Sequence, residues 1–380
     1  MPLILRIIAV LAALLLMFSV LWDAFETIVL PRRVRRRFRL TRMFYQWTWM
    51  PWSSFARDHI KREGRREGFL SFFGPLALLA LLVVWAAGLV VGFALLQWAF
   101  GSKLAGAVYH SGFFTDLYYS GTTFFTLGLG DIAPQSAPAR FITVAEAGLG
   151  FGFLALIISY LPVLYQAFSR REVNVSLLDA RAGSPPTALE LLRRSGTGKA
   201  REMLPQFLGD WERWAAELLE SQLSYPSIGY FRSQHENQSW LSALTVILDS
   251  CSLVLVGVDD VPRQQAKLTF AIARHAAVDL AQVFGADYRH AKDGRLSPED
   301  RVRLRETLAT AGLPIREGPE ADKKLAHLRG MYEPYVIALA RYFVIDLPPW
   351  LPAPGAIDDW QSSPLEGSDM ETMSTLSAGS

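Results

Sequence analysis

The residues of this chain with the clearest chemical meaning lie in Tyr118–Pro134, which reads YYSGTTFFTLGLGDIAP. Within it, two glycines of Thr126–Asp131 alternate with larger residues in the order T-L-G-L-G-D. Glycine adopts backbone conformations that are closed to other residues, so such a loop can turn several carbonyl oxygens to one side. Carbonyl oxygens arranged in rings replace the water shell of a dehydrated cation. This chemistry predicts cation binding by the backbone of Thr126, Leu127, Gly128 and Leu129.

The segments around this loop must hold it at membrane depth. Two long apolar segments, Phe69–Phe100 and Phe141–Phe168, enclose it, and a short, mildly amphipathic stretch, Phe113–Phe125, comes directly before it. Backbone that is not helical survives at membrane depth only where it lines a water-filled path or is buried in protein. An apolar helix, a short re-entrant helix, a glycine loop and a second apolar helix together predict a pore-loop cation channel.

The loop resembles the filter of the two-transmembrane pore-loop potassium channel superfamily, a family of bacterial ion channels. That family usually has T-V-G-Y-G-D after a pore helix that ends near S-x-x-T-x-T. Leu129 stands where the family usually has Tyr, and Phe125 stands where it usually has Thr. The resemblance covers about residues 69–168. The positions that match are Ser120 and Thr123 in the pore helix and Thr126, Gly128, Gly130 and Asp131 in the filter.

This resemblance implies a homotetramer, because four copies of the loop are needed to surround one ion. It also implies potassium as the permeant ion, no other cofactor and no enzymatic activity. The Thr126 hydroxyl would act as an inner ligand. For Asp131 two roles stay open: a ring of carboxylates that concentrates cations at the outer mouth, or a hydrogen bond that holds the loop to its own pore helix. Leu129 lacks the hydroxyl with which Tyr braces the filter, so we predict a softer filter.

Glu146 is the one charged residue in the apolar segment that follows the loop. An ionisable residue inside a membrane span is a functional hypothesis by default. Counting from Asp131 places Glu146 near the depth of the filter, where we expect it to brace the pore helix through Thr122 or Thr123. The alternative is an ion pair with Arg140. The predicted support residues are therefore Ser120, Thr122, Thr123 and Glu146.

The same apolar segment contains three alternating glycines and a proline. Gly150 best matches the position where the family's inner helix bends, and Pro162 removes a helix hydrogen bond near its lower end. We therefore predict a gating hinge at Gly150 and Pro162. Glycines in membrane helices mostly allow close packing, and we favour that role for Gly148 and Gly152.

Three segments approach or exceed the ~20 apolar residues that span a bilayer. The first is Ile7–Trp22, extending to Leu30, and the other two enclose the loop. Twelve Lys or Arg against three Asp or Glu lie between Pro31 and Glu67, whereas Gly101–Arg140 contains only Lys103 and Arg140 as basic residues. The excess of basic residues marks the cytosolic side. We predict three spans in a bacterial inner membrane, with the N-terminus outside and the C-terminus in the cytosol.

The basic linker of residues 31–68 mixes arginines with Trp47, Trp49 and Trp52. Tryptophan prefers the headgroup level and arginine attracts anionic lipid. We therefore expect a partly helical segment on the inner membrane surface, with anionic lipid at Arg32–Arg42 and no nucleic acid as partner. Asp23 and Glu26, at the end of the first span, are expected to pair with the arginines that follow.

From Arg170 onward the chain reads as a soluble, all-helical domain that extends to Leu347. Helix starts are predicted at Ser184, Ser239, Pro262 and Ser297, and the corresponding ends at Gly196, Gly257, Gly285 and Gly312. The tail from Pro348 is rich in Pro, Ser, Gly and acids and is expected to be disordered. The predicted parts are residues 1–30 (first helix), 31–68 (basic linker), 69–169 (pore module), 170–347 (cytosolic domain) and 348–380 (tail).

The resulting fold is an all-α membrane protein with a tetrameric pore and a cytosolic domain that regulates or assembles it. The favoured function is passive potassium conduction. Two alternatives stay open: a weakly selective monovalent cation channel, and a non-conducting scaffold or sensor built on a pore module. The sequence contains no H-E-x-x-H motif, no paired cysteines and no G-x-G-x-x-G after a strand. It indicates no ligand for the cytosolic domain.

Overall fold

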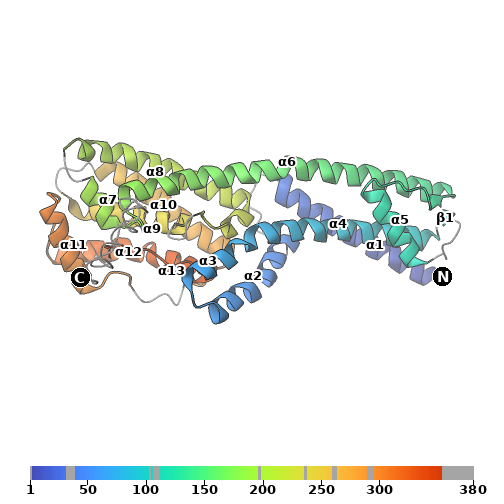
Figure 1. The fold of residues 1–380 in the computed structure, drawn as a ribbon, viewed down its shortest axis with the longest axis horizontal. Coiled ribbons are helices and arrows are strands. Elements are labelled where there is room, and N and C mark those ends of the chain that lie inside the picture. The colour runs from blue at the N-terminus through green and yellow to red at the C-terminus, as the bar shows by residue number, and fades with distance from the viewer. Residues whose placement is uncertain are drawn as a thin grey trace, which may run out of the picture. The chain divides into compact units, whose positions relative to one another are not determined.

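The computed structural model describes residues 2–30, 39–101, 104–105, 112–195, 198–234, 238–258, 263–288 and 294–352. The described chain is almost entirely helical and divides into two compact units (Figure 1). The pore unit comprises Met1–Trp52 and Phe72–Gln166, and the C-terminal unit comprises Ser53–Ser71 and Ala167–Ser380. Residues 31–38, which include most of the predicted lipid-binding arginines, lie outside the described residues.

The pore unit is built from long helices. They are α1 (Leu3–Ala24), the π-helical turn η1 (Phe25–Val29), the first part of α2 (Leu40–His59), α4 (Phe73–Phe100), α5 (Phe113–Phe124) and most of α6 (Ala137–Ala182). A short antiparallel pair joins β1 (Leu104–Ala105) to β2 (Ala133–Pro134), with Leu104 opposite Pro134. These two strands connect the segment before the pore helix to the segment after the filter.

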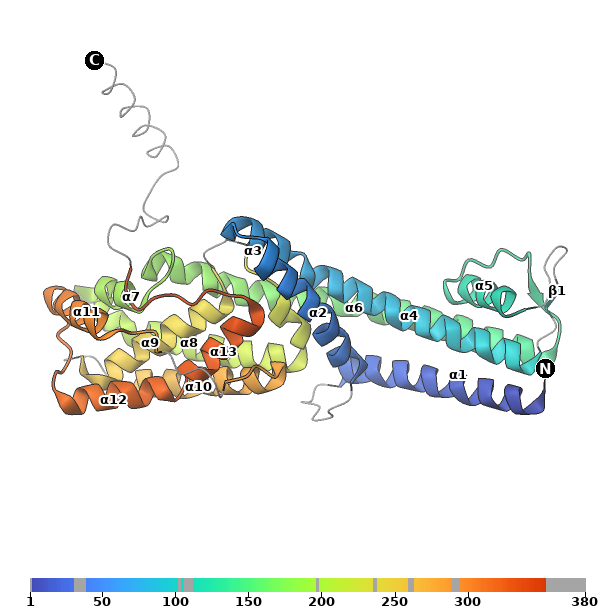
Figure 2. The ribbon, with the colours of Figure 1, turned by 90° about the horizontal axis from the view of Figure 1, so that it is seen from below.

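Small residues allow α1 to lie close against α4, as Figure 2 shows. A Cβ atom added to Gly92 would lie 2.4 Å from Cγ of Met17, and one added to Gly88 would lie 2.9 Å from a methyl group of Val20. On the facing side, Ala13 of α1 is fully buried. Close approach through small residues is the usual way for membrane helices to associate, because lipid provides no hydrophobic drive between them. The Gly88–Gly92 spacing is the sequence signal for this contact.

Two acidic residues near the end of α1 have different partners. Glu26 lies 3.7 Å from the guanidinium of Arg39, as expected for a pair with the following arginines. Asp23 instead accepts hydrogen bonds from the Thr41 hydroxyl at 2.6 Å and from the Trp85 indole N–H at 3.0 Å. Among the described residues, Asp23 therefore has no arginine partner, contrary to the expected pair, and Arg32–Arg37 lie outside them. Asp23 joins the ends of α1 and α2 to the middle of α4.

The tryptophans of α2 are not all on the surface. Trp47 is 67% exposed, which suits a headgroup contact, but Trp49 is buried and its ring lies 4.7 Å from that of Phe73. Trp52 also contacts Phe73, at 5.8 Å between ring centres. The expectation that all three tryptophans lie on the membrane surface is therefore wrong for Trp49, which anchors α2 to the start of α4.

The C-terminal unit is a bundle of helices. Their bounds are α3 (Glu63–Ser71), α7 (Ala188–Arg194), α8 (Gly198–Ser224), η2 (Pro226–Tyr230), α9 (Trp240–Gly257), α10 (Arg263–Phe284), α11 (Pro298–Thr310), α12 (Pro319–Gly330) and α13 (Glu333–Phe343). The predicted starts of α9 and α11 are confirmed, since Ser239 and Ser297 accept hydrogen bonds from the N–H groups of Ser242 and Asp300. Helix α7 begins three residues later than predicted, because Thr187 caps it in place of Ser184.

Within the described residues, four helical segments are long and apolar enough to cross a membrane. Three correspond to the predicted spans and the fourth is α9, whose apolar stretch is 94% buried inside the C-terminal unit. Asp249, in the middle of α9, is fully buried and is bound by both terminal nitrogens of Arg295, at 2.6 and 3.1 Å. A buried carboxylate needs such a bidentate partner. Helix α9 therefore forms the core of the bundle.

The two C-terminal boundaries of the sequence analysis compare differently with the structure. The predicted boundary at residue 169 lies close to the division between the units, at Gln166 and Ala167, although helix α6 itself continues without interruption to Ala182. The chain also stays packed beyond Pro348: Trp350 is 1% exposed, and its carbonyl accepts the Leu189 N–H at 3.1 Å. The guanidinium of Arg295 covers the Trp350 ring at 5.8 Å. Residues 353–380 of the predicted tail lie outside the described residues.

Candidate ion-conduction site

The filter segment, Thr126–Asp131, begins where the pore helix α5 ends. The last turn of α5 closes with the Phe125 N–H donating to the Gly121 carbonyl at 3.1 Å. The Leu127 and Gly128 N–H groups then both donate to the Thr122 carbonyl, at 2.8 and 3.4 Å. The backbone donors of the first filter residues are therefore held by the end of their own pore helix.

Every second residue of the filter segment, starting at Thr126, has a left-handed φ angle. The φ angle is +56° at Thr126, +56° at Gly128 and +74° at Gly130. Glycine adopts these angles without strain, but a non-glycine residue such as Thr126 does so rarely, and such outliers gather at functional sites. Within the described chain, no N–H or hydroxyl group donates a hydrogen bond to the carbonyl oxygens of residues 126–129. These carbonyls are free to coordinate a cation.

The filter segment is uncovered on a single chain. Every residue from Phe125 to Asp131 is exposed, and the side chains of Leu127 and Leu129 are each 62% exposed. A soluble monomer rarely exposes such a continuous apolar stretch, and larger ones mark interaction surfaces. The described residues of this chain therefore leave the whole segment uncovered.

Asp131 is held by its own chain through both carboxylate oxygens. The Tyr118 hydroxyl, on the pore helix, donates to one oxygen at 2.9 Å, and the Ile132 N–H donates to the other at 3.1 Å. This geometry supplies the brace between filter and pore helix that the sequence left as one of two roles for Asp131. The Asp131 side chain stays exposed at the mouth of the segment.

Glu146 lies behind the pore helix and is fully buried. Its carboxyl group contacts the Ser120 hydroxyl, which also lies 2.8 Å from the Val90 carbonyl of α4. The expected partners of Glu146 are therefore wrong. Thr122 bonds to its own helix, at the Tyr119 carbonyl, and Arg140 donates to the Pro134 carbonyl at 3.3 Å.

A second polar contact extends this support toward the outer end of the helices. The Tyr119 hydroxyl lies 2.8 Å from that of Thr143, which in turn lies 3.4 Å from the Gln97 amide nitrogen. Tyr119 belongs to the pore helix α5, Thr143 to α6 and Gln97 to α4. These contacts therefore link the pore helix to the two helices that flank it in sequence. The sequence reasoning missed Gln97 and Thr143. The signal available was a pair of hydrogen-bonding side chains in otherwise apolar spans.

The inner helix meets the pore helix at Gly150. A Cβ atom there would lie 2.2 Å from the Phe124 carbonyl oxygen, whereas no atom of the described chain lies within 4 Å of a Cβ at Gly148 or Gly152. Gly150 is therefore closely packed against the pore helix, in addition to its predicted hinge role, whereas Gly148 and Gly152 contact no described atom of this chain. Pro162 lies inside the uninterrupted helix α6.

Comparison with known proteins supports this site. Residues 79–166 match the model of a family described as "Ion channel". This stretch contains most of α4, the pore helix, the filter segment and the first part of α6, so the resemblance to pore-loop channels is confirmed for it. Residues 79–166 of this helical membrane protein are therefore similar to ion-channel proteins.

A relative extends the similarity beyond this module. The chain is 24% identical to the uncharacterized membrane protein YdjJ of Bacillus subtilis (strain 168) over 224 residues, which is 58% of this chain and 62% of that protein. The similarity thus covers less than two thirds of the relative. No solved structure matches the chain.

Proposed function

We propose that this protein is a homotetrameric channel that conducts potassium passively across a bacterial inner membrane. The observation that supports this function best is the filter segment, whose N–H groups are held by the pore helix while its carbonyl oxygens have no donor within the described chain. Four such segments around one axis would offer successive rings of carbonyl oxygens to a dehydrated cation. The exposed apolar filter of a single chain supports assembly with further copies.

Each filter residue has a separate part in this mechanism. Carbonyls of Thr126, Leu127, Gly128 and Leu129 would replace the hydration shell, and the Thr126 hydroxyl would act as the innermost ligand. Gly130 lets the chain turn outward at φ +74°. Asp131, held by Tyr118, fixes the outer end of the loop and places a negative charge at the mouth.

Weak selectivity among monovalent cations is a second candidate function, and Leu129 favours it. Its side chain carries no hydroxyl and is exposed, so it provides no hydrogen bond behind the filter. The Tyr118–Asp131 bond holds the loop only at its outer end. A filter that is held only at one end can contract around a smaller ion at a lower cost in free energy than a filter that is held along its whole length.

The C-terminal unit is proposed to regulate conduction through the two helices that it shares with the pore unit. Helix α6 continues into it, and α3 leads through Phe72 into α4. The buried Arg171 of α6 donates to the Ile228 and Phe231 carbonyls, at 3.0 and 2.8 Å. The next residue, Arg232, lies 3.3 Å from Glu67 of α3. The segment Ile228–Arg232 therefore binds the extensions of both pore-lining and outer helices.

Membrane lipid is the remaining partner that we propose. The arginines of the linker favour an anionic inner surface, and the exposed Trp47 and Met50 of α2 would lie in the headgroup layer. The N-terminus would then lie outside and the C-terminal unit in the cytosol.

Ion flux into proteoliposomes tests the filter. Purified protein should admit thallium, and Gly128→Ala should abolish the flux, because alanine at φ +56° costs about 1–2 kcal/mol in each copy. Gly312→Ala is the matched control, since Gly312 has a φ of +75° with open space around it but lies at the end of α11. The control variant should conduct normally. Undiminished flux in Gly128→Ala would refute the filter assignment.

A further inference from the structure

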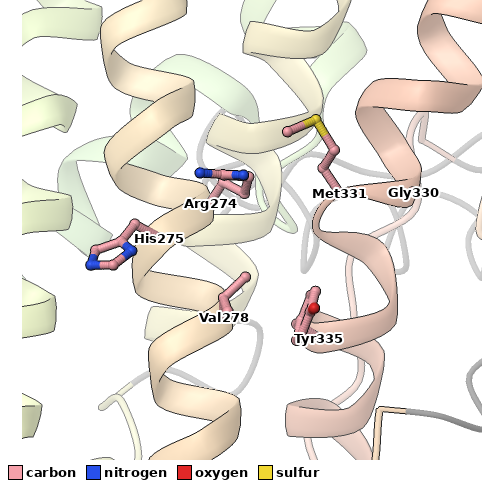
Figure 3. Close-up of a pocket in the computed structure, with 6 residues that line it drawn as sticks. All are labelled: Arg274, His275, Val278, Gly330, Met331 and Tyr335. Atoms are coloured by element: carbon pink, nitrogen blue, oxygen red, sulfur yellow. The ribbon is translucent and has the colours of Figure 1, made fainter.

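A pocket of about 290 Å³ opens in the C-terminal unit between α10 and the junction of α12 with α13 (Figure 3). One wall comes from α10 and the other from the end of α12 and the first turn of α13. The lining residues are Arg274, His275, Val278, Gly330, Met331 and Tyr335. None of these lining residues belongs to the filter segment or to the residues that support it.

The pocket carries positive charge without a counter-charge. Arg274 extends from α10 toward the opposite wall near Met331, as Figure 3 shows. Its Nε atom is buried and, in the described part of the chain, has no hydrogen-bond partner. The lining residues that the structure describes include no carboxylate. The nearby Asp279 lies 3.8 Å from His275, at the rim, so its charge is already shared.

Neighbouring guanidinium groups in the same unit bind carboxylates through their terminal nitrogens. Arg295 binds Asp249 at 2.6 Å, and Arg329, one residue before Gly330, binds Glu333 at 3.0 Å. Their Nε atoms, like that of Arg274, have no partner in the described chain, so the difference between these arginines lies in the carboxylate. The half-buried Arg274 has no carboxylate partner among the described residues, and its charge is therefore available to an acidic ligand.

The remaining lining residues indicate the size and polarity of the part of the ligand that does not contact Arg274. Gly330 has no side chain, and no described atom lies within 4 Å of a Cβ placed there, which keeps the pocket open. Val278 and Met331 provide apolar surface. The Tyr335 ring is held by Tyr288, with ring centres 4.7 Å apart. The volume lies near the lower limit of ~300 Å³ for ligand pockets, so a small molecule fits and a dinucleotide does not.

We propose that this pocket binds a small organic oxyanion, either a carboxylate or a phosphate ester, on a planar or apolar body. The planar fork of a guanidinium matches both head groups in a bidentate manner. Arg274 would bind the head group, while Val278, Met331 and the Tyr335 ring would contact the body. The proposal does not depend on which ion the pore conducts.

Calorimetric titration of the full-length protein in detergent tests this assignment. The probes are benzoate, phenyl phosphate and benzamide, the last being a neutral analogue of benzoate with the same shape. We expect saturable binding of at least one anion and none of benzamide. The anion that binds more tightly identifies the head group. Absence of saturation with both anions, or equal binding of benzamide, overturns the proposal.

Variants locate the binding at this pocket. Arg274→Gln keeps a polar side chain but removes the charged guanidinium, and it should weaken anion binding about tenfold or more. Gly330→Leu leaves every charge in place and fills the open space, so it should also abolish binding. Arg341→Gln, an exposed arginine on α13, is the control and should bind as the native protein does. Native affinity in both Arg274→Gln and Gly330→Leu would place the anion elsewhere, and thermal melting followed by circular dichroism verifies that each variant folds.

Discussion

At the scale of single residues, the filter combines left-handed backbone with an unusual way of holding it. The Asp131 carboxylate accepts a hydrogen bond from Tyr118 of the pore helix. The exposed side chain of Leu129, two residues earlier, has no group that could form a second such bond. Selectivity is a free-energy difference between two ions, and about 1.4 kcal/mol corresponds to a tenfold ratio. A brace missing from four copies of the loop is enough to change that ratio, since one hydrogen bond contributes about 0.5–1.5 kcal/mol.

We therefore predict that Leu129→Tyr raises the permeability of potassium relative to sodium. The added hydroxyl restores the group with which the resembling family braces its filter, and we expect it to stiffen the loop against collapse around the smaller ion. Reversal potentials measured with potassium on one side and sodium on the other give the ratio directly. Leu129→Phe, which adds the ring without the hydroxyl, is the control. Equal, high selectivity in the native protein and in Leu129→Tyr would mean that other contacts already hold the filter.

At the scale of the helices, sequence patterns predicted the elements better than their contacts. Serine caps and apolar runs located α9 and α11, because these signals are local. The partners of Glu146 and Asp23 were missed, since they lie on other helices at distances in sequence that no local pattern encodes. The continuation of α6 to Ala182 was also missed: a change from apolar to polar residues marks a membrane boundary, but it does not end a helix.

The contact between α6 and the pore helix leads to a prediction about Gly150. Alanine there would place its Cβ 2.2 Å from the Phe124 carbonyl, so α6 or the end of α5 must move. Overpacking of this kind costs about 1–3 kcal/mol, which changes an equilibrium about 5- to 150-fold. We expect thallium flux to fall at least about fivefold. Gly148→Ala, where the described chain leaves open space, should retain flux. If Gly150 acted only as a hinge, alanine would slow opening and closing but leave the conductance of the open pore unchanged. Single-channel recordings distinguish this outcome from a distorted filter, which would lower the conductance.

At the scale of the whole molecule, the two units are joined by helices that continue from one into the other. The predicted topology places the helices of the pore unit in the membrane and the C-terminal unit in water. Helix α1 has no charge from Ile7 to Trp22, and twelve basic residues follow between Pro31 and Glu67. That excess favours a cytosolic linker, and α4 must then return the chain to the outside before the filter. On this topology we expect the C-terminal unit to lie in the cytosol. The buried, paired Asp249 favours a place for α9 inside the bundle over a fourth crossing, although its hydropathy alone would allow one.

This arrangement is testable with the chain's only cysteine. Cys251 is fully buried in α9, so it should not react with a maleimide reagent in the folded protein. Three predicted crossings divide the chain into four segments outside the membrane. A single cysteine can be placed in each of them, at the exposed positions Pro2, Lys61, Gln135 and Val302. A reagent that cannot cross membranes should label positions 2 and 135 in intact cells, because the N-terminus and the segment after the filter lie outside. Positions 61 and 302 should react only after permeabilisation, which also shows that they are accessible. Labelling of position 61 in intact cells would reverse the orientation, and protection of position 2 until permeabilisation would mean that α1 does not cross the membrane.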